Sequence, residues 1–269
     1  MKKNIAILSM SYIMFLILLF LSGALSGVLS DVAYYAAFIL PIALALYATR
    51  GETAEGISHL SIDGAKVKRI LPLIAPTVAI VVIISFVTSL LIFIISGRTN
   101  EVDLGDNFVS ALFLHALLPA ILEEALFRYL PMRLLSHISR RVCVLASAIF
   151  FALVHHDVFS IPYAFAAGII FMTVDLMTDS VIPSVLIHFI NNALSVGVIV
   201  FSDNIAFAPT VYVILGILTL ISLSFLYRRR EEYLTEVSSV LKDNGRLPVS
   251  IEMIAFAVLT LGIAVLNLL

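Results

Sequence analysis

The sequence is poor in charge: 13% of its 269 residues are Asp, Glu, Lys or Arg, whereas 61% are hydrophobic. A soluble domain of this length exposes far more polar side chains, so the composition excludes an ordinary soluble protein. The apolar residues come in blocks of about the 20 residues that a helix needs to cross a bilayer. The sequence therefore predicts an all-α, polytopic transmembrane helix bundle of about eight to nine spans.

Other absences narrow the chemistry. Cys143 is the single cysteine, so intrachain disulfides and cysteine-rich zinc sites are excluded. Tryptophan is absent, so an aromatic belt at the membrane surface must use tyrosine and phenylalanine. The net charge is −2 and no basic patch suits nucleic acid, so no nucleic-acid partner is expected.

The apolar blocks are separated by short polar loops. The predicted spans cover about residues 1–30, 32–48, 70–96, 108–135, 142–156, 157–178, 180–201 and 209–226, with 249–269 as a ninth. Residues 231–247 are polar but place Leu234, Val237, Val240 and Leu241 on one helical face. This segment is predicted to be an amphipathic helix at the cytoplasmic membrane surface.

Basic and acidic residues fall into alternate loops. The loops on one side collect Lys2, Lys3, Arg50, Lys66, Lys68, Arg69, Arg133, Arg140, Arg141 and Arg228 to Arg230. The loops on the other side collect Asp31, Glu101, Asp103, Asp106, Asp157 and Asp203, with Arg98 as the exception. Because cytoplasmic loops carry the excess of Lys and Arg, we expect a multi-pass membrane protein whose N-terminus is cytoplasmic.

The fourth predicted span contains two adjacent acids and an arginine in an apolar run. Glu124 and Arg128 are four residues apart, so they share a helical face and can pair. Glu123 is rotated from Glu124 by about 100°, which leaves it free for chemistry. Ionisable side chains inside a membrane default to functional candidates. The alternative is that all three form a structural ion cluster.

Two later spans carry further polar side chains. His155 follows Phe151 by four residues and shares its face, although a histidine at a helix end is often only interfacial. His188 and Asn192 are also four apart, which places an imidazole and a carboxamide together in an apolar helix. Their alternative role is an interhelical hydrogen-bond pair.

Several intramembrane hydrolase classes are missing from the sequence. It has no His-Glu-x-x-His zinc motif, no Gly-x-Gly-Asp and no Gly-x-Ser-Gly nucleophile turn. The remaining set is Glu-Glu-x-x-x-Arg, Phe-x-x-x-His and His-x-x-x-Asn, in this order and on separate spans. This set resembles the CAAX-protease and bacteriocin-processing family of intramembrane endopeptidases, which is related to type II CAAX prenyl endopeptidases.

The resemblance covers about Phe108 to Phe201. It implies a catalytic transmembrane core at 108–202, between N-terminal transmembrane helices at 1–107 and C-terminal helices with the amphipathic segment at 203–269. It also implies roles for seven residues: Glu123 as general base helped by His155, His188 and Asn192 as the oxyanion site, and Glu124, Arg128 and Phe151 as the pocket that supports them.

The resemblance favours a glutamate-dependent reaction without a metal cofactor. A zinc site made by Glu123, His155 and His188 is the alternative, because three nitrogen or oxygen ligands plus water form a catalytic zinc pattern. The expected partners are a peptide or protein substrate, including lipid-modified ones, and membrane lipid. From a different class, a transporter or immunity-type protein could keep such a polar cluster without catalysis.

Overall fold

The computed structural model describes residues 1–50, 60–61, 64–97, 107–155, 160–242 and 244–266. Over these residues all regular elements are helices and none is a strand, which confirms the predicted all-α class. Seven helical runs in this part of the chain are long and apolar enough to cross a bilayer. They are α1 (Lys2–Gly23), α2 (Val28–Ala48), α3 (Gly64–Ser96), the run from Phe108 to Leu135, α8 (Ser160–Thr178), α9 (Ile182–Val200) and α10 (Phe207–Arg228). The fold is that of an integral, multi-pass membrane protein.

The other two expected spans are shorter helices. α7 (Arg140–Leu153) has 14 residues, or about 21 Å of helix, which is less than the ~30 Å of a hydrocarbon core. α12 (Ile251–Leu266) has 16 residues. The amphipathic segment expected at 231–247 forms a helix only as far as Leu241, as α11 (Arg230–Leu241). It packs against the start of α3, where the Tyr233 hydroxyl donates to the Arg69 carbonyl at 2.8 Å.

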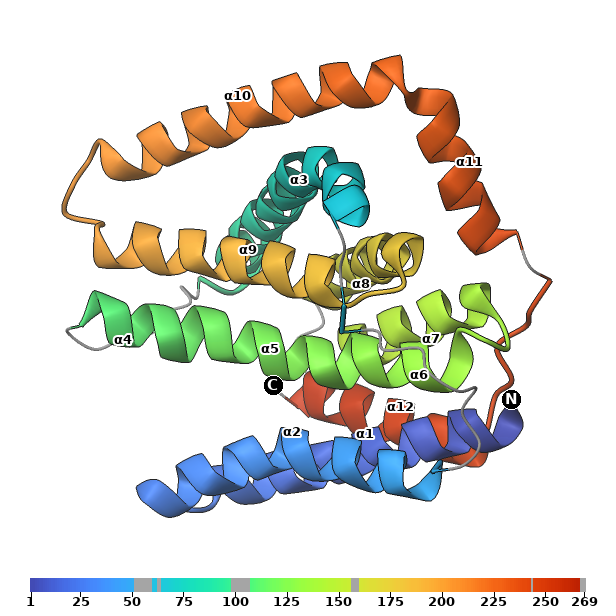
Figure 1. Cartoon of the computed structure of the whole chain (residues 1–269). Helices are drawn as coiled ribbons and strands as arrows, with labels where there is room; N and C mark the ends of the chain where they lie inside the picture. Colours follow the sequence, from blue (N-terminus) through green and yellow to red (C-terminus); the bar gives the residue numbers. More distant parts are fainter. Residues whose placement is uncertain (51–59, 62–63, 98–106, 156–159, 243, 267–269) are drawn as a thin grey trace.

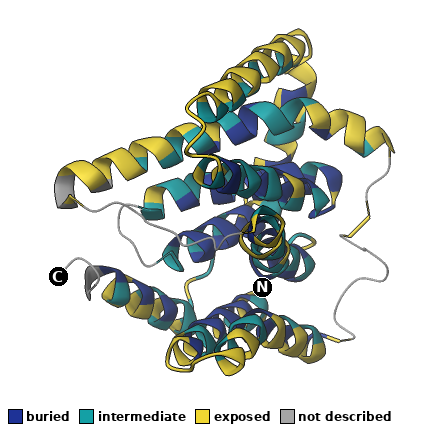
Figure 2. Cartoon of the chain, turned by 90° about the vertical axis from the view of Figure 1, so that its left-hand side faces the viewer, coloured by how far each residue is buried: buried dark blue, intermediate teal, exposed yellow. Residues whose placement is uncertain are grey.

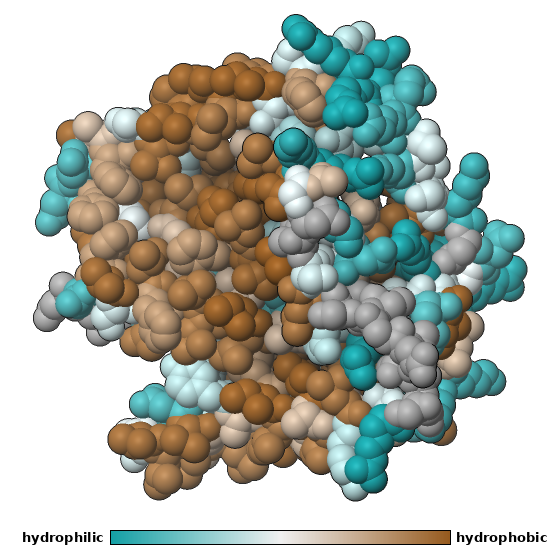
Figure 3. All heavy atoms as spheres, in the orientation of Figure 1, coloured by the Kyte–Doolittle hydropathy of each residue, from teal (hydrophilic) through white to brown (hydrophobic). Residues whose placement is uncertain are grey.

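The helices form layers around a buried centre. α1 and α2 lie side by side on one side of the molecule with α12 next to α1, and α10 lies on the opposite side (Figure 1). Buried residues gather in the central helices and on the inward side of α1, whereas α10 is largely exposed (Figure 2). Apolar residues cover most of the face seen in Figure 3, and hydrophilic residues gather at the end that carries α11. This pattern fits a bundle with a lipid-facing belt.

The run from Phe108 to Leu135 is continuous but contains two widened turns. It consists of α4 (Phe108–Leu112), the π-helical turn η1 (Phe113–Leu117), α5 (Leu118–Glu124), the π-helical turn η2 (Ala125–Tyr129) and α6 (Leu130–Leu135). Each π turn ends two residues before a proline, at Pro119 and Pro131. Proline lacks the N–H that would continue the α-helical ladder. The ladder shifts instead, and the Leu130 N–H bonds to the Ala125 carbonyl five residues back.

The second widened turn leaves carbonyls that other helices use. The Phe127 carbonyl accepts a 2.6 Å hydrogen bond from the Ser147 hydroxyl of α7. The Leu126 carbonyl accepts a 3.3 Å hydrogen bond from the Tyr12 hydroxyl of α1. An unsatisfied carbonyl costs several kcal/mol in hydrocarbon, so these contacts hold the π turn in place. The turn directly follows Glu124, so it also fixes the position of the acidic motif.

α7 and α8 pack closely at one glycine. A Cβ atom added at Gly168 would lie 2.7 Å from the Cα atom of Ala148, closer than side chains normally approach. The close approach aligns α8 with the helix that ends just before His155. Gly168 is therefore required by the packing of the two helices and not by backbone conformation.

We expect the substitution Gly168→Ala to lower the free energy of unfolding by about 1–3 kcal/mol, because the backbone of α7 must move. Thermal unfolding of the purified protein in detergent measures this change. Gly262→Ala in α12 is the matched control, since an added Cβ there meets no atom within 4 Å. A Gly168→Ala protein as stable as this control would contradict the packing account.

Candidate active site

The centre of the site is a chain of three charged or polar side chains. The Glu124 carboxylate is fully buried, and its Oε2 atom lies 3.1 Å from Nε of Arg128. Its Oε1 atom lies 2.7 Å from Nδ1 of His188, which comes from α9. The pairing predicted from the four-residue spacing is therefore present. Because an ionised carboxylate only accepts hydrogen bonds, Nδ1 of His188 must donate, and Nε2 is the nitrogen left for chemistry.

Aromatic rings enclose the guanidinium of Arg128. Its Cζ atom lies 4.1 Å from the ring centre of Phe151 and 5.4 Å from that of Phe171. Nη1 and Nη2 of Arg128 make no hydrogen bond to the residues that the structure describes. Cation–π contacts of this kind are stronger away from water. Phe151, which was expected to support the pocket, thus contacts the Arg128 guanidinium directly.

Glu123 has a different environment from Glu124. Its side chain is 26% exposed, compared with 0% for Glu124. It lines a cavity of about 180 Å³ together with His155, Tyr34 and Phe127. Its Oε2 atom lies 3.8 Å from Nε2 of His188. This distance is too long for a direct hydrogen bond, but a water molecule can bridge such groups.

His155 lies two residues beyond the end of α7 and faces the same cavity. Its Nδ1 atom is 2.8 Å from the Phe151 carbonyl, and its ring packs edge-on against the Phe151 ring at 4.7 Å. A carbonyl oxygen can only accept, so Nδ1 carries the proton and Nε2 is an acceptor in the neutral ring. Phe151 therefore contacts both Arg128 and His155.

Of the predicted site residues, Asn192 has the fewest contacts with the others. It lies one turn beyond His188 on α9 and is partly buried. Its carboxamide oxygen accepts from Nδ2 of Asn191 at 3.4 Å. In the described part of the chain Asn192 makes no hydrogen bond with Glu123, His155 or His188. A role for Asn192 stays a prediction.

The residues considered for zinc are Glu123, His155 and His188. Within the described ranges, no group of three or more His, Cys, Asp or Glu is arranged to hold a metal ion. Zinc binding by these three residues stays an untested alternative. Asp157, one of the expected outer-loop acids, lies outside the described residues, as do Arg98, Glu101, Asp103 and Asp106.

The sequence reasoning missed Asp175 on α8. Its carboxylate is fully buried, and Oδ1 accepts a 3.0 Å hydrogen bond from the backbone N–H of Ser184. Ser184 is the third residue of α9, so Asp175 caps this helix from the neighbouring one, one turn before His188. The rule that intramembrane acids are functional candidates, applied to every span, would have found it.

We expect Asp175→Ala to lower the free energy of unfolding by about 1–3 kcal/mol, because the buried Ser184 N–H loses its acceptor. Asp175→Asn keeps an acceptor oxygen and should restore part of this loss. Thermal unfolding in detergent gives both values, with Asp203→Ala in an exposed turn as the control. If Asp175→Ala matched that control, the capping role would be wrong.

A comparison with known protein families gives one match. Residues 105–194 match the family model of "Type II CAAX prenyl endopeptidase Rce1-like". No curated protein and no solved structure matches the chain. The matched region lies almost entirely within the predicted core at 108–202 and includes all seven predicted site residues. The resemblance noted from the three motifs is thus confirmed: residues 105–194, about a third of the chain, match an Rce1-like type II CAAX prenyl endopeptidase domain.

Proposed function

We propose that the protein is an intramembrane endopeptidase of the CAAX prenyl protease type, in which Glu123 and His155 activate a water molecule. The observation that carries this proposal is the difference between the two adjacent glutamates. Glu124 is fully buried and paired, whereas Glu123 is partly exposed and lines a cavity with His155. A general base must reach water and substrate, and of the two only Glu123 has that access.

In the first step Glu123 takes a proton from water while the hydroxide oxygen attacks the carbonyl carbon of the scissile bond. The neutral His155, held through Nδ1, offers Nε2 as an acceptor that orients the same water. The reaction forms a tetrahedral intermediate with a negative oxygen. Two acceptors directed at one water molecule are a standard arrangement for activating it.

His188 then serves as the donor to that oxygen. With Nδ1 bonded to Glu124, a proton on Nε2 makes the ring an imidazolium, which the buried carboxylate stabilises. Asn192, one turn further on, is the second proposed donor. The intermediate collapses when Glu123 returns the proton to the leaving amine and the carbon–nitrogen bond breaks. Removing one such donor typically slows catalysis by about 10²–10³.

The substrate is proposed to be a peptide or protein segment at the membrane face, with lipid-modified peptides as the first class to test. Glu124 lies eleven residues before the end of α6 at Leu135, or about 16 Å of helix. That end is followed by Arg140 and Arg141, which the positive-inside rule places in the cytoplasm. The proposed topology therefore has a cytoplasmic N-terminus and a site in the cytoplasmic half of the bilayer.

The proposal is tested by hydrolysis of a fluorogenic prenylated peptide by the purified protein. Glu123→Gln should lower kcat/KM by about 10²–10⁴, because the general base is lost while the shape is kept. Glu231→Gln, at an exposed position on α11, should keep wild-type activity. Wild-type levels of hydrolysis by Glu123→Gln would contradict the role of this residue. Absence of hydrolysis of prenylated and unmodified peptides by the wild type would favour a non-enzymatic membrane protein.

Metal dependence is tested separately with chelator. The glutamate mechanism predicts that dialysis against a zinc chelator leaves kcat/KM unchanged. Loss of activity that returns with added Zn²⁺ would instead support the zinc-dependent version with Glu123, His155 and His188. Metal content of the purified protein, measured by mass spectrometry, provides the independent check.

A further inference from the structure

A second, larger cavity lies away from Glu123, between α3, α9 and α10. It has a volume of about 550 Å³, within the range of ligand sites in proteins. All three helices belong to the runs that are apolar and long enough to cross a bilayer. The cavity therefore lies between helices that are expected to cross the bilayer.

α10 forms one wall of this cavity and packs loosely. It has no buried residue along its 22 positions. The Thr219 hydroxyl of α10 donates to the Ala75 carbonyl of α3 at 3.3 Å, and the Phe207 ring at the start of α10 lies 4.8 Å from the Phe201 ring. In Figure 1 α10 runs along the edge of the molecule, apart from α9. A chain-like molecule between α9 and α10 would cover surface that the protein itself leaves open.

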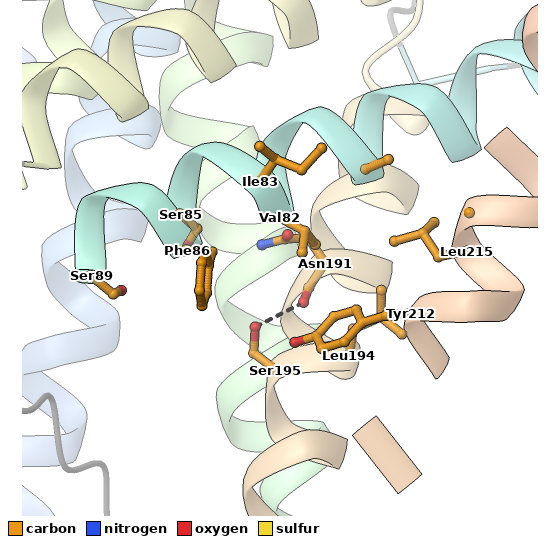
Figure 4. Close-up of a pocket in the computed structure, with 12 residues that line it drawn as sticks. Val82, Ile83, Ser85, Phe86, Ser89, Asn191, Leu194, Ser195, Tyr212 and Leu215 are labelled. Carbon is orange, nitrogen blue, oxygen red and sulfur yellow. Dashed lines mark hydrogen bonds between the residues drawn. The ribbon is translucent and has the colours of Figure 1, made fainter. Parts of the chain in front are cut away.

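The lining of the cavity is mixed but carries no charge among the described residues. Val82, Phe86, Leu194 and Leu215 supply apolar surface. The polar groups are the side chains of Ser85, Ser89, Asn191, Ser195 and Tyr212. In Figure 4 the last three lie around the same space, and the Ser195 hydroxyl donates to the Asn191 carbonyl at 3.1 Å. Hydroxyl and amide groups without a counter-charge suit an uncharged polar group, because a bare ion here would stay unpaired.

Three of the five polar residues lie toward the same face of the membrane. Ser195 lies five residues before the end of α9, Tyr212 five residues after the start of α10, and Ser89 seven residues before the end of α3. These helix ends face away from the basic loops. From Ser89 to Ala79 the cavity follows α3 for ten residues, or about 15 Å of helix. The shape thus suits a chain that lies toward the membrane centre with its polar end toward the opposite face.

We propose that this cavity binds a single-chain amphiphile of the bilayer whose polar group is an uncharged hydroxyl, ester or amide. The chain contacts Val82, Leu194 and Leu215, and the polar group contacts Ser195 and Tyr212. The site is separate from the cavity of Glu123 and His155 and does not depend on the protein being a protease. The cavity is lined by Asn191 of α9, so the bound molecule contacts the helix that carries His188. The Asn191 side chain in turn donates to the Asn192 side chain at 3.4 Å.

The test uses a photoreactive long-chain alcohol and the full-length protein in detergent, with labelled peptides identified by mass spectrometry. Labelling is expected in α3, α9 and α10, and an excess of unlabelled alcohol should abolish it. Gly216→Leu should reduce this labelling about tenfold, because the leucine fills the cavity. An added Cβ at Gly216 meets no atom within 4 Å, so the new side chain leaves the backbone without a clash and extends into the open space.

Gly262→Leu in α12 is the matched control, because this glycine is equally unobstructed but lies outside the cavity. Tyr212→Phe should weaken alcohol binding, whereas Tyr227→Phe at the other end of α10 should not. Probes with a carboxylate or a quaternary ammonium in place of the hydroxyl should label these helices less. The proposal is overturned if Gly216→Leu labels like Gly262→Leu, or if the charged probes label equally well.

Discussion

The structure depends on one buried charge chain, in which Arg128 pairs with Glu124 and Glu124 holds His188. Glu124 and Arg128 are both fully buried, and the chain joins the central helical run to α9. Removing one partner of a buried ion pair typically costs about 3–5 kcal/mol, because the other charge is left uncompensated. The pair also sets the imidazole orientation, so the same contact that ties helices together prepares Nε2 of His188 for chemistry.

The surrounding helices hold this charge chain in place from several sides. Phe151 of α7 covers the Arg128 guanidinium with its ring and accepts from His155 with its carbonyl. Asp175 of α8 caps α9 just before His188. The π turn after Glu124 is held by hydroxyls of α1 and α7. A site built this way is rigid on its buried side, whereas Glu123 remains next to open space, which is the arrangement that a general base requires.

The spacing of residues along the sequence predicted the contacts that form within a single helix. The four-residue step placed Glu124 beside Arg128, and the 100° rotation separated Glu123 from it. Contacts between helices could not be predicted in this way. The spacing paired His188 with Asn192, whereas in the structure His188 faces the two glutamates, at 2.7 Å from Glu124 and 3.8 Å from Glu123. The π turns depend on where Pro119 and Pro131 shift the hydrogen-bond ladder, which periodicity does not show. The short α7, which brings His155 beside Glu123, was expected to end three residues later, at about residue 156.

The central claim is that Glu123 acts as the general base, whereas Glu124 stabilises the fold by pairing with Arg128. It is tested by measuring both thermal stability and peptide hydrolysis for Glu123→Gln and Glu124→Gln. The account predicts that Glu123→Gln unfolds at the wild-type temperature and has a kcat/KM lowered by about 10²–10⁴. It predicts that Glu124→Gln unfolds at a clearly lower temperature, because Arg128 loses its counter-charge. A Glu124→Gln protein as stable as the wild type, or a Glu123→Gln protein that hydrolyses peptide normally, would contradict it.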